Sequence, residues 1–265
     1  MQKGWRIGAK IGILLLLGMS VIGHIQSQTI FTDRPTQTTS SALLAKGHLQ
    51  FETGAFLLTS NTSLFGQDFK EQLWVFNNTL FRFGLSDKIE LRLVQDLSQF
   101  RLKINNGPFT SDFQAQPTLI GAKFQLLRDS NQLPDLSLVT QVGGSLLDNR
   151  DFAFQSSLLL AADQAINDEW AVSGNVGLNL TNDWSTTAFV YTAMLTRAIN
   201  TQLTAFFEYY VSLNEANFNN HALDFGLIYL VNDFLQIDAY GGFGLTESTP
   251  DLLVGFGLSH KILKD

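Results

Sequence analysis

Charged side chains stand inside segments that otherwise alternate like β-strands, and their types and spacing could support ion pairing or solute selection. They are Glu52, Arg82, Glu90, Arg92 and Lys123. All fall on the polar faces of neighbouring strand candidates, where carboxylates and cations lie within pairing reach. One hypothesis is a charged constriction that selects solutes. The other, which we favour, is a structural network of paired charges that fills a narrow lumen.

Later strand candidates carry small residues on their polar faces, which would leave room on that side of a lumen. These residues are Gly143, Ser145, Ser173, Asn175, Gly177, Asn179, Gly242, Gly244, Gly255 and Gly257. Together with the charged residues they suggest an off-centre passage, with charge on one wall and small residues on the other.

Catalysis has little support among the histidines, which are His24, His48, His221 and His260. No pair has the spacing of metal ligands. A membrane-embedded esterase needs a Ser–His pair with a polar third group, and His260 follows Ser259, but no third residue is evident. We therefore expect a protein that is not an enzyme and has no cofactor, catalytic residue or metal site. A hydrolase that uses His260 or His221 is kept as a third hypothesis.

The elements that would position these residues are strands, most clearly between Leu203 and Leu245. In the first run, Leu203, Ala205 and Phe207 fall on one face, while Thr204 and Glu208 fall on the other. A period of two indicates strands with one apolar face. Three such runs, separated by short polar gaps, predict an antiparallel meander. Runs of about ten residues match the length that crosses a bilayer as a tilted strand.

The same pattern recurs along the chain and gives about twelve strands. They are His48–Leu58, Glu71–Leu85, Ile89–Phe100, Gln116–Leu127, Leu136–Leu147, Phe152–Ala162, Trp170–Leu180, Thr186–Arg197, Leu203–Leu213, His221–Val231, Leu235–Leu245 and Leu252–Ile262. An even number is typical of single-chain outer-membrane barrels. The sequence therefore predicts an all-β, closed, antiparallel up-and-down barrel.

Composition narrows the class of protein. The chain has 265 residues, no cysteine, a net charge of −7 and only 15% charged residues, against roughly 25% in soluble domains. A negative charge without a basic patch argues against nucleic acid as a partner. Without cysteine there are no disulfides and no thiol chemistry.

The N-terminus predicts export. Lys3, Arg6 and Lys10 precede an apolar run from Ile11 to Gly23, followed by a polar stretch. This is the pattern of a signal peptide, because the run is too short to span a membrane as a helix. We divide the chain into a signal peptide (1–27, cleaved after Ser27), a polar lead-in segment on the periplasmic side (28–47) and a barrel (48–265).

Three features predict that the apolar strand faces point outward, into lipid. The chain is exported, the strands are long enough to span, and charges occur in mid-strand. Lipid forbids an open sheet edge, so the barrel must close. Aromatic residues could form the interfacial girdles. They are Trp74, Trp170, Trp184, Tyr191, Tyr209, Tyr210 and Tyr229.

The gaps between strands indicate an orientation. One set is short, as in the turn at Ser86–Lys88, whereas 59–70, 101–115 and 214–220 are longer and polar. Short periplasmic turns and long outer loops are typical of this class. We therefore expect the three long gaps to be outer loops. Whether residues 28–47 dock into the periplasmic mouth is left open.

Several motifs resemble the outer-membrane family named "Putative MetA-pathway of phenol degradation". They are the lead-in Asp33, Arg34 and Pro35; Lys46 and Gly47; Glu52, Thr53 and Gly54; Arg82, Gly84, Leu85, Ser86 and Asp87; and Glu90, Leu91 and Arg92. The segment from Leu230 to Leu245 is similar to the family's penultimate hairpin. The resemblance covers essentially the whole mature chain. It implies an outer-membrane barrel with a transport role.

Together these patterns predict an outer-membrane channel of a Gram-negative bacterium for a small, hydrophobic or aromatic solute. Its expected partners are outer-membrane lipid, the barrel-assembly machinery and an unidentified solute. The alternative is a plugged structural or adhesion barrel whose outer loops bind a partner.

Overall fold

A computed structural model describes residues 30–128, 133–147, 154–181, 186–214 and 219–262. The predicted signal peptide and its cleavage site lie outside these residues. No helix in the described part of the chain is long and apolar enough to cross a membrane.

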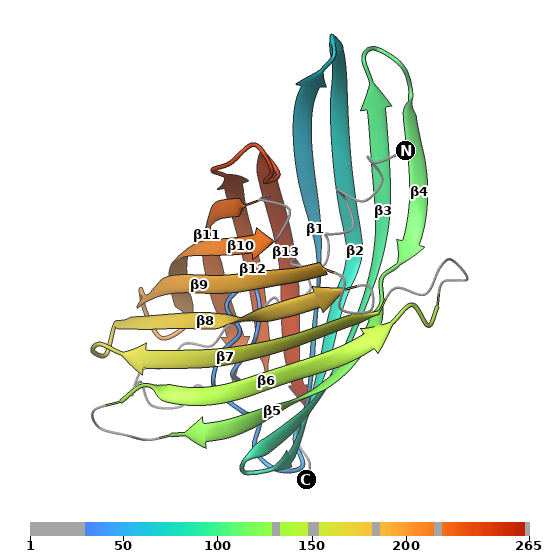
Figure 1. Ribbon diagram of the computed structural model, residues 1–265. Helices are drawn as coiled ribbons and strands as arrows, with labels where there is room; N and C mark the ends of the chain where they lie inside the picture. The colour runs from blue at the N-terminus through green and yellow to red at the C-terminus, as the bar shows by residue number, and fades with distance from the viewer. Residues whose placement is uncertain (1–29, 129–132, 148–153, 182–185, 215–218, 263–265) are drawn as a thin grey trace.

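Thirteen antiparallel strands make up the fold in the described residues (Figure 1). They are β1 (Leu49–Leu64), β2 (Gln67–Ser86), β3 (Ile89–Ile104), β4 (Phe109–Ala115), β5 (Thr118–Leu127), β6 (Asp135–Gly144), β7 (Gln155–Ala165), β8 (Trp170–Thr181), β9 (Thr186–Ala198), β10 (Leu203–Asn214), β11 (Asn220–Asn232), β12 (Leu235–Gly244) and β13 (Leu252–Ile262).

Twelve of these strands close into a barrel. Each ring strand pairs with its sequence neighbours, β5 follows β3 in the ring, and β13 pairs with β1, from Leu49 opposite Ile262 to Thr59 opposite Leu252. β4 lies outside the ring, since it pairs only with the distal half of β3. The twelve predicted strands correspond one to one to the ring strands, which confirms the predicted fold.

The two faces of the barrel wall have opposite character. On β3, Leu91 and Leu93 are 42% and 38% exposed, whereas Glu90 and Arg92 beside them are 0% and 5% exposed. The apolar faces therefore point outward and the polar faces inward, the reverse of a soluble barrel. Of the aromatic residues predicted for the girdles, Tyr210 instead points inward and is buried, and Trp184 lies outside the described residues.

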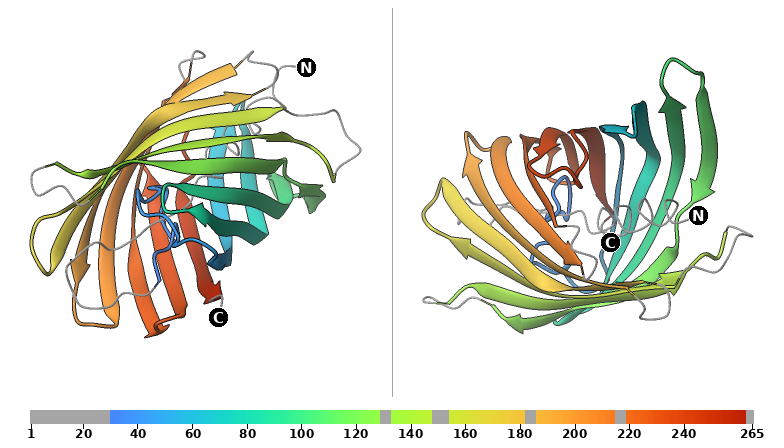
Figure 2. Two further views of the ribbon diagram at one scale, coloured as in Figure 1. Left: turned by 90° about the horizontal axis from the view of Figure 1, so that it is seen from below. Right: turned by 45° about the horizontal axis from the view of Figure 1, so that its top comes forward.

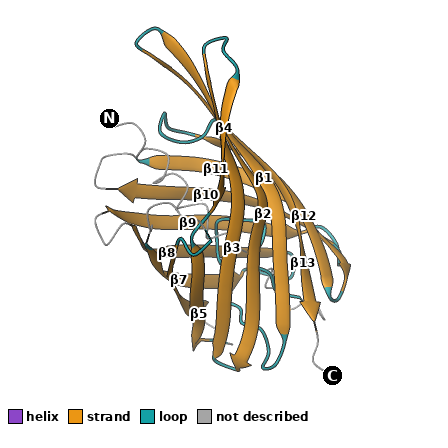
Figure 3. Cartoon of the chain, turned by 90° about the vertical axis from the view of Figure 1, so that its right-hand side faces the viewer, coloured by secondary structure: helices purple, strands orange, loops and turns teal. Residues whose placement is uncertain are grey.

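Two of the predicted outer loops are wrong. Residues 59–70 continue β1 and β2 to a tight turn, where Phe65 and Gly66 both have positive φ (52° and 72°). Two positive φ values in a two-residue turn match the twist of a hairpin. Residues 101–115 likewise form the distal part of β3 and all of β4. The four strands project beyond the rest of the barrel as a small sheet (Figures 1 and 3).

Candidate functional site

The lead-in segment occupies the interior of the barrel. Thr32, Asp33, Arg34 and their neighbours as far as Ser41 are almost fully buried, and Figure 2 shows residues from 30 onward inside the ring of strands. The segment has no regular secondary structure, so its backbone groups must bond to inward-facing side chains. The sequence left open whether the predicted lead-in segment docks, and the structure places residues 30–41 of it inside the lumen.

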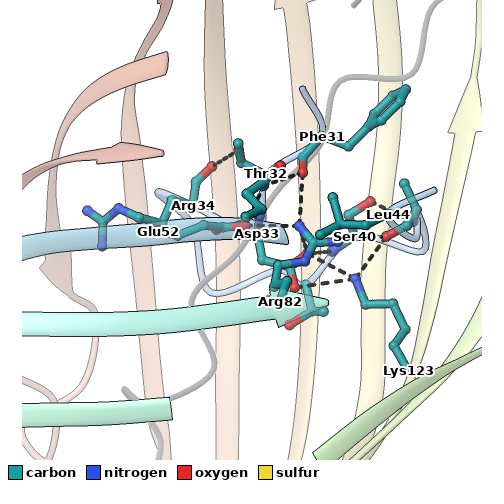
Figure 4. A network of polar contacts seen from close by, with 12 residues as sticks. Phe31, Thr32, Asp33, Arg34, Ser40, Leu44, Glu52, Arg82 and Lys123 are labelled. Atoms are coloured by element: carbon teal, nitrogen blue, oxygen red, sulfur yellow. Dashed lines mark hydrogen bonds and ion pairs between the residues drawn. The ribbon is translucent and has the colours of Figure 1, made fainter. Parts of the chain in front are cut away.

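Asp33 is the centre of a buried ion network (Figure 4). Its carboxylate accepts hydrogen bonds from Lys123 Nζ (3.1 and 3.3 Å) and from Arg92 Nη1, and lies 3.7 Å from Arg82 Nη1. Its backbone N–H donates to Glu52 Oε2 at 2.9 Å. The network contains three cations and three carboxylates among the described residues, so its charges balance.

Arg82 is satisfied at all five of its N–H donors. Nε and Nη2 donate to the two oxygens of Glu90, each at 2.8 Å, and Nη1 donates to Glu52 Oε1 at 2.9 Å. The remaining donors reach the carbonyls of Phe31 (2.9 Å) and Ala42 (3.0 Å) in the lead-in segment. A buried guanidinium is tolerated when every donor is paired. The wall and the segment therefore complete each other's hydrogen bonds.

The ionised form of Asp33 is stabilised by its neighbours. Burial by itself would raise the pKa of this carboxyl, but the charges of Arg82, Arg92 and Lys123 outweigh burial and hold the pKa below its ordinary value. The segment thus docks with its carboxylate charged.

Arg34 binds a different set of wall residues from those that bind Asp33. Its Nη2 and Nε donate to the two oxygens of Asp238 (3.1 and 3.3 Å), and Nη1 donates to Asn78 Oδ1 at 2.9 Å. The guanidinium lies against Gly54 and Gly257, which are paired across β1 and β13. A Cβ on Gly257 would fall 2.3 Å from Arg34 Nη2. Glycine is needed there because Arg34 occupies that space.

The remaining wall binds the segment through carboxylate, amide and hydroxyl groups that have no cation opposite them in the described part of the segment. Glu208 accepts from the backbone N–H groups of Gln37 (2.8 Å) and Thr38 (2.7 Å) and from the Thr38 hydroxyl. The residues that bind the segment farther round the wall are Asp163, through Ser40 and Ser41; Asn175, through Thr39; Ser137, through Ser41; and Gln236, through Thr32.

The structure brings all five predicted lumen charges together and adds the predicted lead-in motif to them. Asp33 joins the charges, Arg34 binds beside them, and Pro35 follows through a cis peptide bond. The sequence interpretation missed Asn78, Asp163, Asn175, Glu208 and Asp238 as docking residues. A signal existed: β7, β10 and β12 carry inward carboxylates with no cation directly opposite them on an adjoining strand, so their partners had to come from elsewhere in the chain.

At three of the small residues, larger side chains occupy the space that a Cβ would take. The space over Gly255 is filled by the Tyr240 ring, and that over Gly257 by Arg34. The Leu159 side chain similarly lies over Gly177. Small residues therefore accommodate large neighbours in this lumen.

The hydrolase hypothesis gains no support from the geometry. Ser259 is buried on the inner face of β13, whereas His260 is exposed on the outer face. Successive residues of a strand point to opposite sides, so the two side chains cannot form a pair. His221 Nδ1 lies 2.6 Å from the Tyr209 hydroxyl rather than near a serine.

A model of the family described as "Putative MetA-pathway of phenol degradation" matches residues 32–262. No curated protein matches the chain.

Among solved structures, the COG4313 outer-membrane channel from Pseudomonas putida F1 superposes with a TM-score of 0.61 and 12% identity, over 83% of this chain and 97% of that one. The translocator domain of the autotransporter NalP from Neisseria meningitidis gives 0.54 and 9%, over 82% and 89%. The KdgM porin gives 0.54 and 8%, over 80% and 99%. These likenesses establish the outer-membrane barrel fold.

Proposed function

We propose, because the chain belongs to the family "Putative MetA-pathway of phenol degradation", that it is a non-enzymatic outer-membrane channel for a small hydrophobic or aromatic solute. A signal peptide would direct it to that membrane. The fold and the outward apolar face support a barrel in the outer membrane, and the family description supports an aromatic solute.

An apolar stripe on the inner wall carries the proposal for the solute. It crosses seven strands that are contiguous in the ring, from β2 through β1 and β13 to β9. Its members are Phe56, Leu58, Leu73, Val75, Met194, Phe206, Ile228, Tyr240 and Leu253. Barrel interiors that conduct water and ions are polar. A stripe of this extent suits a solute that prefers apolar contact.

The stripe continues toward the projecting sheet. Leu58 pairs with Leu73, and Leu73 pairs with Phe100, so the three share the inward face. Farther along that face lie Leu102 and Ile104 on β3. Apolar side chains thus line a path from the outer end of the barrel toward the lumen.

We propose that the docked lead-in segment closes this path. The segment bonds to opposite sides of the wall, from Glu52 on β1 to Asn175 on β8. Passage of a solute therefore requires the segment to shift within the lumen.

Solute preference can be tested by making the stripe polar. The variant Phe56→Gln/Phe206→Gln is compared with wild type and with Leu159→Gln, an inward apolar residue of a separate cluster. Uptake of the apolar dye N-phenylnaphthylamine by Gram-negative cells lacking other porins is followed by fluorescence. We expect severalfold slower uptake for the double variant and little change for the control. Equal uptake by all three would contradict the proposal.

Gating can be tested with a reversible lock, since the chain has no native cysteine. Ser41 and Ser137 are in contact, with Ser137 Oγ 2.5 Å from the Ser41 carbonyl. A Ser41→Cys/Ser137→Cys variant should take up dye slowly when oxidised, and its rate of uptake should recover on reduction. Either single variant should take up dye at the same rate in both redox states. Equal transport in both states would exclude the segment as the gate.

The closed lumen and the projecting hairpins favour one alternative, a structural or adhesion barrel. In that case neither dye uptake nor bilayer conductance would exceed that of protein-free membranes, with the lock reduced or oxidised.

A further inference from the structure

Three cations gather on the outer face of the projecting sheet. Lys70 on β2 lies directly opposite Lys103 on β3, and Gln72 lies opposite Arg101. All of these residues fall on the strand face that also carries Trp74, opposite to the inward face of Leu73 and Val75. The cluster therefore points away from the lumen. It lies on the same face of the strands that faces lipid nearer the middle of the barrel.

The three cations, Lys70, Arg101 and Lys103, make no direct ion pair with a carboxylate within the described residues. Two carboxylates lie on the same face without pairing with these cations: Asp68, which accepts from Ser63, and Asp251, which accepts from Asn61 opposite Lys70. Like charges directly opposite each other destabilise a sheet. The chain has a net charge of −7 and still places Lys70 and Lys103 opposite each other. Stability of the sheet does not explain this arrangement, so the cations have a role other than folding.

One aromatic ring holds two of the cations together. The Arg101 guanidinium carbon lies 4.5 Å from the centre of the Phe109 ring, and Lys103 Nζ lies 5.9 Å from it. Phe109 pairs with Lys103 across β3 and β4. β4, the strand outside the barrel ring, thus completes the cluster.

The height of the cluster matches a headgroup layer. Trp74, stacked on Phe76, shares a cross-strand row with Gln99 and Phe113, and such aromatic residues mark a membrane interface. Arg101 lies two residues beyond that row and Lys103 four, or about 7 and 14 Å along the strand. The connections from β2 to β3, β7 to β8, β9 to β10 and β11 to β12 are short and lie at the other end of the barrel, so we take the end with the projecting sheet as the outer one.

We propose that Lys70, Arg101 and Lys103 bind the phosphate groups of lipid A in the outer leaflet. Lysine and arginine are the usual partners of phosphate, and arginine can bind it bidentately. The site anchors the projecting sheet to the membrane surface. This proposal does not depend on which solute the lumen passes.

The test titrates the purified full-length barrel in nonionic detergent with fluorescent diphosphoryl lipid A. The variant Lys70→Gln/Arg101→Gln/Lys103→Gln is compared with Lys46→Gln/Lys88→Gln/Arg197→Gln, which removes three exposed cations from the periplasmic end. We expect a loss of affinity of roughly tenfold or more for the first variant, and a change of less than twofold for the second. Equal losses in the two variants would overturn the proposal.

Two further comparisons separate a phosphate site from general attraction to anions. The charge-conserving variant Lys70→Arg/Lys103→Arg should retain wild-type affinity, and monophosphoryl lipid A should bind severalfold more weakly than the diphosphoryl form. Binding of phosphatidylglycerol micelles as tight as that of diphosphoryl lipid A would refute a lipid A site. Unboiled gel mobility confirms that each variant is folded.

Discussion

At the scale of single residues, the motifs that resemble the family are the residues that join the lead-in segment to the wall. Asp33 bonds to Glu52, and Arg34 lies over Gly54, so two motifs separated in sequence form one contact. Arg82 and Glu90 form a bidentate ion pair beside Asp33 and Glu52. The docked segment explains why these motifs occur together, because each of these residues bonds to or packs against another of them.

Gly257→Ala should loosen the segment while leaving the barrel intact. The three atoms nearest to the added Cβ would all belong to Arg34, at 2.3–2.4 Å, so Arg34 would have to move away from Asp238. Gly241→Ala is the control, since its closest neighbour is 3.5 Å away. Maleimide labelling of a cysteine reporter at the buried Leu43 should accelerate tenfold or more in Gly257→Ala only. Unchanged labelling would show that Arg34 does not hold the segment.

At the scale of elements, the lead-in segment works as an internal element without regular structure. A strand satisfies its backbone through its neighbours, whereas this segment relies on carboxylates and amides of the wall. Glu208 receives two consecutive backbone N–H groups, and Asn175 both donates to and accepts from Thr39. Charge balance around Asp33 makes the docked position specific, since no other residue of the segment from 30 to 44 is acidic.

Asp33→Asn should destabilise the docked segment strongly. The substitution leaves Arg82, Arg92 and Lys123 with only Glu52 and Glu90, and removing one partner of a buried ion pair costs about 3–5 kcal/mol. We expect fast labelling of the Leu43 reporter. Asp168→Asn, which removes an exposed carboxylate from the turn between β7 and β8, is the comparison and should not reproduce the effect. Slow labelling of Asp33→Asn would argue that the charge network contributes little to docking.

The contribution of Asp33 should depend on pH only in acid. Its folded pKa is depressed, so its stabilisation is fully present above the ordinary value of 3.8 and is lost as pH falls through the folded pKa. The measurement is the midpoint temperature of the gel mobility shift for wild type and Asp33→Asn. Their difference should be constant from pH 8 to about pH 5 and shrink below about pH 4. A difference that already shrinks near neutral pH would contradict a depressed pKa.

At the scale of the whole molecule, the barrel has a polar interior and an apolar exterior, the reverse of a soluble protein. Buried charged side chains point into the lumen, and apolar side chains cover the outside. Closure through β1 and β13 leaves no free edge in the ring, as a lipid environment requires. The four-stranded sheet formed by β1–β4 rises beyond this ring and carries cations on its outer face.

A charge on the outer surface should be costly in proportion to its depth. Val176 lies in the middle of β8, and Val231 lies near the periplasmic end of β11; the two are similarly exposed, at 42% and 40%. In lipid, Val176→Arg should destabilise the barrel by about 2–4 kcal/mol and Val231→Arg by about 0–1 kcal/mol. Urea unfolding in liposomes measures both. Equal costs would mean that the outer face is not embedded as inferred.

The sequence by itself determined the fold. Alternation with a period of two places Glu90 and Arg92 on one face and Leu91 on the other, and in lipid a chain with this pattern has one stable arrangement, a closed barrel. Every ring strand, and the lumen position of the five charged residues, follows from that local rule.

Only the tertiary structure decided what lies inside the ring. The lead-in segment has no periodicity, and its partners, such as Asp238 for Arg34, are separated from it by more than two hundred residues. The hairpin extensions also escaped local interpretation, because polar residues at 59–70 resemble a loop until cross-strand pairing accounts for them. Contacts between distant segments depend on closure of the whole barrel, which no local pattern encodes.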